Sequence, residues 1–411
     1  MKNVLLSIMA LATMAVCSVS CEKDQKDDAE YQERINQDYG RFATDGHRYK
    51  VQGNTATVSL PAPGDGNDYD WHFMMTSYVI PEKVEIDGKI YTVTGIGERA
   101  FEQCSKLASV TIPQTITTIG QGAFAKCVSL RSIIIPEGVT SLDDWVFAGC
   151  TSLTSITLPN SLQEIGENVF GNCSSLTSIE IPASVTNMGV NVFYGCTGLK
   201  SLKVSCKEIG KHAFAWLENL TELILGEGVE TIGEGAFNSC SNLTSVTLSC
   251  KEIGQGVFSY MSKLTNVVLN EGVEVIGDYA FRYCSKITSI NFPSTLKLIE
   301  GYAFNGCSGI ENITIPDGVE EIGEGAFWDC YKMKTLTLGS GIKIIGTSAF
   351  QGCSSLTDIY CRATDIPETG WNPFAFDWEA YEKITLHVPL ASLANYKAHE
   401  EWGKFKNIVA M

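Results

Sequence analysis

A phenylalanine that returns at nearly constant intervals constrains most strongly how this chain can fold. Nine of the eleven intervals are 23 residues long and two are 21. A fixed period of about 20–50 residues is typical of solenoids, in which each repeat packs only against its neighbours. The 411-residue sequence therefore predicts one stack of twelve coils over residues 98–361 instead of several compact domains. The repeat phenylalanines are Phe101, Phe124, Phe147, Phe170, Phe193, Phe214, Phe237, Phe258, Phe281, Phe304, Phe327 and Phe350.

The residues that follow each phenylalanine alternate between apolar and polar, which is typical of a β-strand. In one unit Leu176, Ile179 and Ile181 are apolar, whereas Ser178 and Glu180 are polar. Side chains two residues apart in a strand share a face, so the apolar set is predicted to point into the core. The two 21-residue units keep this strand and shorten the turn, because turns tolerate changes in length. One unit buries too little apolar surface to offset the backbone entropy of ordering it, so the coils must stack.

Both ends of the repeat array carry segments that can cover it. Residues 46–97 contain strand-like alternation with turn signals at Gly53-Asn54 and Asp87-Gly88, which predicts an N-terminal β cap built from hairpins. Residues 362–411 are predicted to form the C-terminal cap. In that cap we expect a last strand around residues 384–388 and one amphipathic helix from Leu393 to Phe405.

The first 21 residues have the features of a lipoprotein signal peptide. Lys2 precedes a largely apolar run, Val4–Val16, which is shorter than the ~20 residues that span a bilayer. Small residues lead into Cys21, although Ser18 stands where such signals usually have leucine. We expect lipidation of Cys21, with an ordinary cleaved signal as the alternative. The charged residues 22–45 predict a flexible acidic tether, and acidic residues directly behind the cysteine resemble the export tag of surface-exposed outer-membrane lipoproteins.

The repeat consensus is similar to a known family. The pattern Leu-x-x-Ile-x-Ile-Pro, Ile-Gly and Ala-Phe-x-x-Cys, with the Val388-Pro389 to Ile408 ending, resembles the BspA-type leucine-rich repeats over about residues 90–411. The resemblance implies an α+β, mostly β fold: a right-handed leucine-rich-repeat solenoid with a curved parallel sheet. Members are typically surface proteins of bacteria and some protists, and several are adhesins toward host proteins. No fixed binding motif defines the family, so the resemblance assigns no functional residue.

The sequence contains little that would support catalysis or metal binding. Ten of the 15 cysteines stand three residues after a repeat phenylalanine, a slot that also accepts leucine and methionine, which predicts a buried row of thiols. Disulfides between adjacent repeats and zinc are the alternatives. None of the five histidines pairs at motif spacing with a nucleophile or metal ligand. We therefore predict no catalytic residue, no cofactor and no metal.

The charge balance restricts the class of partner. Lys and Arg total 30 against 47 Asp and Glu, and the net charge of −17 would repel a nucleic acid backbone. The outward strand positions hold small, mostly uncharged residues, which either face a flat partner or simply contact solvent. Large aromatic residues and one arginine, the usual anchors of protein interfaces, occupy variable positions. The candidate partner-binding residues are Trp145, Trp216, Tyr260, Tyr279, Arg282, Tyr283, Tyr302, Trp328 and Tyr360, and Tyr194 is of the same kind.

Two functional hypotheses follow. The first is a non-catalytic cell-surface lipoprotein that mediates protein–protein interaction or adhesion to host or other cells. The second is a surface lipoprotein that captures glycans or peptides for nutrient uptake. Aromatic platforms on the concave sheet would favour the second, and Tyr360 is the one found there. Because Trp216, Tyr260 and Tyr283 share the slot two residues after a repeat phenylalanine, we expect them to approach one another along one edge of the stack.

Overall fold

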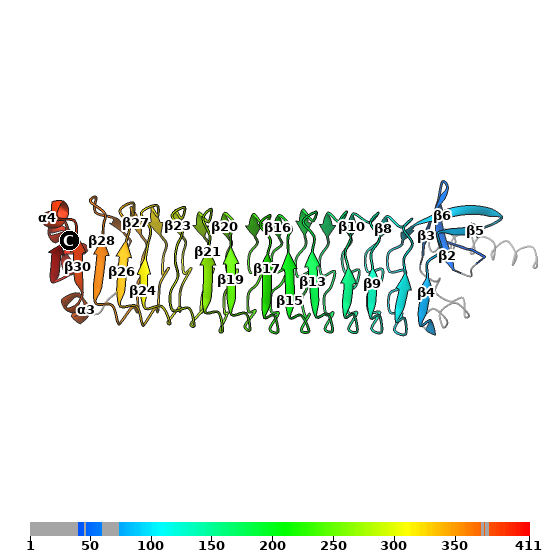
Figure 1. The fold of residues 1–411 in the computed structure, drawn as a ribbon, viewed down its shortest axis with the longest axis horizontal. Helices are drawn as coiled ribbons and strands as arrows, with labels where there is room; N and C mark the ends of the chain where they lie inside the picture. Colours follow the sequence, from blue (N-terminus) through cyan, green and yellow to red (C-terminus); the bar gives the residue numbers. More distant parts are fainter. Residues whose placement is uncertain (1–39, 45–46, 60–73, 371–373, 375–377) are drawn as a thin grey trace, which may run out of the picture.

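The computed structural model describes residues 40–44, 47–59, 74–370, 374 and 378–411. The predicted signal peptide, Cys21 and most of the predicted tether lie outside the described residues. Figure 1 shows an elongated stack of coils, with β1 to β6 at one end and α3, α4 and β31 at the other. The expectation of a mostly β leucine-rich-repeat solenoid is confirmed.

Each coil adds one strand of a long row that runs along the stack (Figure 1). Neighbouring strands are parallel and in register where they pair, as in Ser155↔Ser132 and Leu202↔Leu223. The coil between β21 and β24 contributes a single paired residue in place of a strand, through the bridge between Val268 and Asn291. The row comprises β4 (Ser77–Val79), β7 (Ser109–Thr111), β9 (Ser132–Ile134), β11 (Ser155–Thr157), β13 (Ser178–Ile181), β15 (Ser201–Val204), β17 (Glu222–Leu225), β19 (Ser245–Leu248), β21 (Asn266–Leu269), β24 (Asn312–Thr314), β26 (Thr335–Leu338), β28 (Asp358–Cys361), β30 (Thr385–Val388) and β31 (Asn407–Ala410).

A second row consists of two-residue strands, also parallel to one another. In most of them the first residue faces solvent and the second is buried, so the alternation continues on this side of the coil. This row comprises β8 (Thr118–Ile119), β10 (Ser141–Leu142), β12 (Glu164–Ile165), β14 (Asn187–Met188), β16 (Glu208–Ile209), β18 (Thr231–Ile232), β20 (Glu252–Ile253), β22 (Val275–Ile276), β23 (Leu298–Ile299), β25 (Glu321–Ile322), β27 (Ile344–Ile345) and β29 (Glu368–Thr369).

The repeat phenylalanines form a continuous ladder between the two rows. All twelve are fully buried. Successive rings lie 5.0–5.8 Å apart between centroids and within 2–20° of parallel. Phe374 extends the ladder into the C-terminal cap, 6.0 Å from Phe350. Each ring therefore contacts the coil before and the coil after it, which joins neighbouring repeats through the core.

The backbone turns sharply on both sides of each repeat phenylalanine. The residues two before and two after it have positive φ in all twelve coils, with values between 50° and 78°. This left-handed conformation favours glycine and asparagine, and it costs other residues about 1–2 kcal/mol each. Several coils nevertheless carry tyrosine or tryptophan in these two slots, and those residues project from the turn that joins a two-residue strand to the next long strand.

The predicted row of buried thiols is confirmed. All 13 cysteines in the described part of the chain are buried as free thiols. In nine coils the Sγ of the repeat cysteine donates to the backbone carbonyl of the phenylalanine one coil earlier, as Cys150 does to Phe124 at 3.2 Å. Burial raises the pKa of the Cys150 thiol to about 12. The row thus supplies hydrogen bonds between coils and stays protonated at neutral pH.

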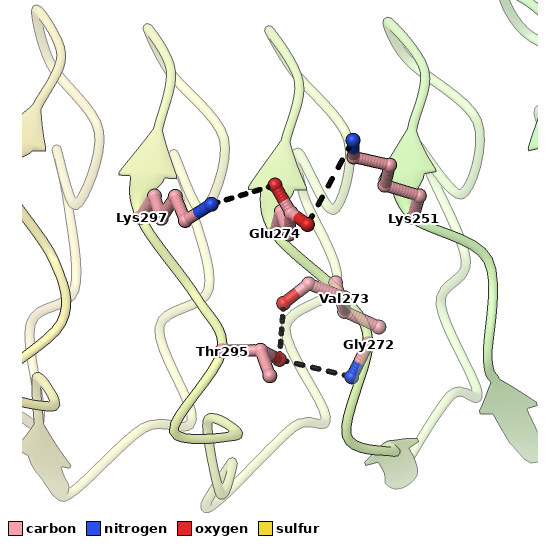
Figure 2. Close-up of polar contacts among 6 residues, drawn as sticks. All are labelled: Lys251, Gly272, Val273, Glu274, Thr295 and Lys297. Atoms are coloured by element: carbon pink, nitrogen blue, oxygen red, sulfur yellow. Dashed lines mark hydrogen bonds and ion pairs between the residues drawn. The ribbon is translucent and has the colours of Figure 1, made fainter.

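Charged and polar side chains link the coils on the outside. Figure 2 shows Glu274 between two lysines, with its oxygens 3.8 Å from Lys251 Nζ and 2.9 Å from Lys297 Nζ. Below them, the Thr295 hydroxyl donates to the Val273 carbonyl at 2.9 Å. The hydrogen bond from Lys297 and the charges of both lysines lower the pKa of Glu274. Such pairs help to fix the register between neighbouring coils.

The N-terminal end is closed by short strands around two hairpins. Its sheet runs β1 (Arg41–Phe42), β2 (Arg48–Gln52), β3 (Thr55–Val58), β6 (Lys89–Ile96) and β5 (Lys83–Ile86). The two turns predicted at Gly53-Asn54 and Asp87-Gly88 are present, because β2 pairs with β3 and β5 with β6 in antiparallel register. The long strand β6 also pairs with β8 of the first coil, which connects this sheet to the stack.

The C-terminal end differs from the sequence prediction. The single helix predicted from Leu393 to Phe405 is wrong: η1 (Leu390–Ser392), α4 (Leu393–Ala398) and η2 (Trp402–Lys404) replace it. The helix ends at His399, which is extended and whose Nδ1 accepts a hydrogen bond from the Trp402 N–H at 3.4 Å. The strand predicted around residues 384–388 is present as β30, but it is not the last, because β31 pairs beyond it. A short helix, α3 (Trp378–Lys383), is also additional.

Candidate interaction surface

The outer face of the long-strand row is exposed and carries little charge. Its outward residues are exposed or half-exposed along the whole row, as the alternation predicted. Apolar side chains occur among the serines and threonines, including Val79 and Ile134, which are each 67% exposed. The Glu180 and Lys203 side chains pair with each other across two strands. This leaves an almost neutral face on an acidic protein.

At the C-terminal end of this face Tyr360 packs against a histidine. The ring of Tyr360 on β28 stacks on His387 of β30 with 4.2 Å between centroids and 11° between planes. The Nε2 atom of His387 is 3.0 Å from an oxygen of Asp358, and this hydrogen bond lowers the pKa of the aspartate. Tyr360 therefore belongs to a small cluster of its own and lies apart from the turn aromatics.

Most of the turn aromatics converge on four neighbouring coils, those of Phe258, Phe281, Phe304 and Phe327. Tyr260 and Tyr283 lie 5.3 Å apart between ring centroids. Tyr279 and Tyr302 stack at 5.2 Å with 6° between planes, and Trp328 follows at 6.0 Å from Tyr302. Tyr260 and Tyr283, each two residues after a repeat phenylalanine, form one column. Tyr279 and Tyr302, each two residues before one, form a second column, and Trp328, directly after Phe327, packs against its end. We define the aromatic–arginine cluster as Tyr260, Tyr279, Arg282, Tyr283, Tyr302 and Trp328.

Arg282 lies between the two columns. Its guanidinium carbon is 4.7 Å from the ring centroid of Tyr283, 5.3 Å from that of Tyr279 and 6.0 Å from that of Tyr260. Its Nε donates to the Asn305 Oδ1 of the next coil at 3.1 Å, and its Nη2 donates to the Tyr283 hydroxyl at 3.4 Å. Cation–π contacts within about 6 Å stabilise a guanidinium in this position.

Glycines in the same turns make room for the rings. A Cβ on Gly306 would overlap the Tyr283 ring, and a Cβ on Gly325 would overlap the Tyr302 ring. Both glycines also have positive φ, so other residues would be strained there. The rings can therefore lie flat along the stack and reach the next coil. Stacked aromatic pairs contribute about 0.5–1.5 kcal/mol, which largely offsets the strain of placing tyrosine in a left-handed turn.

The other sequence candidates lie apart from this cluster. The expectation that Trp216 would approach Tyr260 is wrong, because Ser239 occupies the same slot in the coil between them. Trp216 contacts Tyr194 and His212 instead, at 6.0 Å and 6.3 Å between ring centroids. Trp145 is 44% exposed on a more N-terminal turn.

Three polar residues around the cluster were not identified from the sequence. Asn305 positions the Arg282 guanidinium, and its own Nδ2 donates to the Trp328 carbonyl at 3.2 Å. The Tyr302 hydroxyl donates to the carboxylate of Glu324, which raises the pKa of Tyr302 to about 12. Tyr331, 49% exposed, is hydrogen-bonded to a neighbouring aspartate. Only the 23-residue offset, Arg282 to Asn305, could have indicated the first of these contacts from the sequence.

A shallow groove lies on the other side of the coil, over β14, β16, β18 and β20. It encloses about 580 Å³. Its lining includes Glu208, Glu234 and Glu252, and Lys211 pairs with Glu234 at 3.1 Å. The groove is therefore negatively charged, as is the whole chain.

The structure offers no metal centre in the part that it describes, since no three His, Cys, Asp or Glu side chains converge there. Among the described helices, none has the length and apolar character needed to cross a bilayer. Stacked parallel coils of this kind define a leucine-rich-repeat solenoid.

Comparison with known proteins agrees with this class. The family model for the BspA type leucine rich repeat region matches six copies over residues 82–200, 199–297 and 274–396, so this chain belongs to that family. Repeat proteins of this fold are generally non-catalytic and generally bind other proteins. No curated protein matches the chain.

Solved structures of bacterial leucine-rich proteins are also similar. A leucine rich cell surface protein from Faecalibacterium prausnitzii is 26% identical with a TM-score of 0.46, and the match covers 78% of this chain and 94% of that one. The T. pallidum leucine rich repeat protein is 30% identical with a TM-score of 0.42, and the match covers 49% and 90% of the two chains. A leucine-rich repeat protein from Bacteroides ovatus is 24% identical with a TM-score of 0.39, covering 71% and 93%.

Proposed function

We propose that this protein is a surface-exposed outer-membrane lipoprotein that mediates adhesion by binding a protein on a host cell or another cell, without catalysing a reaction. The observation that carries this proposal is the aromatic–arginine cluster. Tyrosine, tryptophan and arginine are the side chains that most often anchor protein interfaces. Here they converge on one edge of a scaffold whose family generally binds proteins.

Attachment through Cys21 would orient the rod. The proposed tether, residues 22–45, ends inside the cap sheet, because Arg41–Phe42 form β1. The 18 residues from 22 to 39 can extend to about 60 Å at ~3.3–3.6 Å each. Residues 46–97 cap the end next to the tether, and the cluster lies in the half of the stack nearer the other end (Figure 1). This arrangement would hold the cluster away from the membrane. Two or more acyl chains on the cysteine are enough for stable anchoring.

Attachment and exposure can be tested together. Intact cells are treated with protease, and the release of repeat fragments is followed by immunoblot. We expect release from cells with the wild-type chain, and Cys21→Ala should appear in the soluble fraction without incorporating labelled palmitate. Retention of the fragments after shaving, or membrane attachment of Cys21→Ala, would contradict the proposed location.

Partner binding is tested with the purified mature chain on arrays of host and bacterial surface proteins. We expect binding that weakens when Tyr260 and Tyr283 are both replaced by alanine and that is unaffected by Trp145→Ala, a matched change of an exposed ring outside the cluster. The absence of any specific binding would count against the adhesive function.

Glycan capture is the second candidate, favoured by the Tyr360 and His387 stack. Flat rings on an exposed sheet face can pack against sugar rings, and this pair is the aromatic platform on the long-strand row. A glycan array probed with the wild-type chain and with Tyr360→Ala would test it. Glycan binding that is lost in the variant would support this candidate, and an array without hits would exclude it.

A further inference from the structure

The lysines of the repeat array are largely neutralised by glutamates of neighbouring coils. Lys207, Lys211, Lys334 and Lys343 each lie 2.8–3.2 Å from a glutamate oxygen 23 residues away. Glu274 pairs with two more lysines (Figure 2). These charges hold the coils in register and are already balanced within the chain.

Arg282 differs from these lysines. Within the described part of the chain its guanidinium makes no ion pair with a carboxylate, and its polar contacts are to the neutral Asn305 amide and Tyr283 hydroxyl. A guanidinium has five N–H donors in a planar fork, and these two contacts use two of them. The remaining donors fit the two oxygens of a carboxylate, which arginine binds in bidentate geometry.

The surroundings of Arg282 favour one carboxylate on a protein over a polyanion. The chain carries a net charge of −17, and Glu324 and Asp329 lie in the turn that carries Trp328 of the cluster, so a ligand with many negative charges would be repelled. Tyr260 and Tyr283 beside the guanidinium are 46% and 42% exposed and can pack against a side chain that reaches it. Their contact with each other and the close approach of Gly306 to the Tyr283 ring hold the rings before binding, which reduces the entropy lost on association.

We propose that Arg282 is the charged anchor of the interface and that the protein partner presents an aspartate or glutamate side chain to its guanidinium, against the rings of Tyr260 and Tyr283. This inference rests on the proposed protein-binding function. Because the carboxylate would be partly shielded from water by the rings, its contact with the guanidinium should be stronger than a surface ion pair.

The test uses the mature full-length chain and a phage-displayed library of random peptides as the probe. We expect the selected peptides to share an acidic residue next to an apolar or aromatic one. The best peptide is synthesised in two forms, with the acid and with the corresponding amide, and both are titrated against the wild type, Arg282→Gln and Lys286→Gln. Lys286→Gln removes one exposed positive charge from the same coil and serves as the matched control.

Either removal of the Arg282 charge or conversion of the peptide acid to its amide should weaken binding at least about tenfold. The double change should be no weaker than either single change, because both remove the same contact. Lys286→Gln should bind as the wild type does. The amide peptide with the unchanged protein keeps the test valid if Arg282→Gln folds poorly.

Other outcomes separate this inference from the function on which it rests. Selected peptides or array proteins that bind with equal affinity to the wild type and Arg282→Gln would overturn the role of Arg282 and leave protein binding intact. Binding of 3′-sialyllactose that depends on Arg282, with no selected peptide, would show that the carboxylate comes from a saccharide and would overturn the protein partner. No selected peptide and no array binding would refute both proposals.

Discussion

Replacement of Phe237 by alanine tests whether the ring ladder makes the stack cooperative. Phe237 is fully buried in the middle of the array, 5.3 Å from Phe214 and 5.7 Å from Phe258 between ring centroids. Deletion of a buried phenylalanine side chain costs about 3–5 kcal/mol, including the cavity that remains. In a solenoid the stability is close to a sum of repeat and nearest-neighbour terms, so this loss falls on two interfaces.

The expected result is a local weakness that divides the stack. Native-state hydrogen exchange followed by mass spectrometry should show lower protection in the coils around Phe237, with an opening free energy reduced by about 3–5 kcal/mol. Coils near Phe124 and Phe327 should keep most of their protection. Thermal unfolding should become broader or resolve into two transitions, because the halves on either side can unfold separately.

The control is Tyr194→Ala, which removes a ring that is 48% exposed and should change stability by no more than about 0.5 kcal/mol. Two results would refute the reasoning. One is a loss below about 1 kcal/mol for Phe237→Ala, because the ladder would then contribute little. The other is a uniform loss of protection along all coils, because the stack would then unfold as a single unit.

Three further predictions follow from the turns, the thiols and the ion pairs. Gly306→Ala should displace the Tyr283 ring and abolish peptide binding at the cluster. The control Gly149→Ala, in the same slot with similar φ but no ring beside it, should lower the free energy of unfolding only by the ~1–2 kcal/mol of backbone strain. Urea unfolding and peptide titration distinguish the two variants. Burial raises the pKa of Cys150 to about 12, so the buried thiols should stay unlabelled by iodoacetamide at pH 8.5 until urea unfolds the chain. The stability that the protonated thiols contribute should be lost as pH rises above about 9 toward 12. Rapid labelling of the native chain would contradict this. The lysine contacts lower the pKa of Glu274, so the stability contributed by its carboxylate is present above the ordinary pKa of a glutamate and is lost as pH falls through the lowered value. The difference in unfolding free energy between the wild type and Glu274→Gln should therefore vanish on acidification. A difference that persists at pH 2 would argue against the ion pair.

Local features of the chain could be predicted from the sequence. The hairpin at Gly53-Asn54 was predicted because the turn residues themselves adopt the required backbone conformation. The burial of Ile179 and exposure of Glu180 followed from strand alternation, which needs no knowledge of distant residues. The thiol row was predicted because one slot accepts cysteine, leucine and methionine alike. The helix predicted up to Phe405 failed because His399 adopts an extended backbone and its Nδ1 accepts a hydrogen bond from the Trp402 N–H, a local arrangement that ends the helix at Ala398.

The candidate site was only partly visible in the sequence. Aromatic residues in variable turns indicated a surface for binding, and Arg282 stands next to Tyr283 in the chain. The sequence could not show that Tyr279 stacks on Tyr302 while Trp216 packs elsewhere, because this depends on which coils are adjacent and on what fills the same slot between them.

The sequence by itself determined the repeat, its strand, the apolar slots and the stacked architecture, because a periodic chain that cannot bury its apolar face in one unit must bury it against the next. The tertiary structure alone decided which surface residues meet. Coil stacking places residues 23 apart side by side, and left-handed turns direct the side chains out of the stack. Arg282 therefore lies between three rings and the Asn305 of the next coil, a grouping set by distances between coils and not by order along the chain.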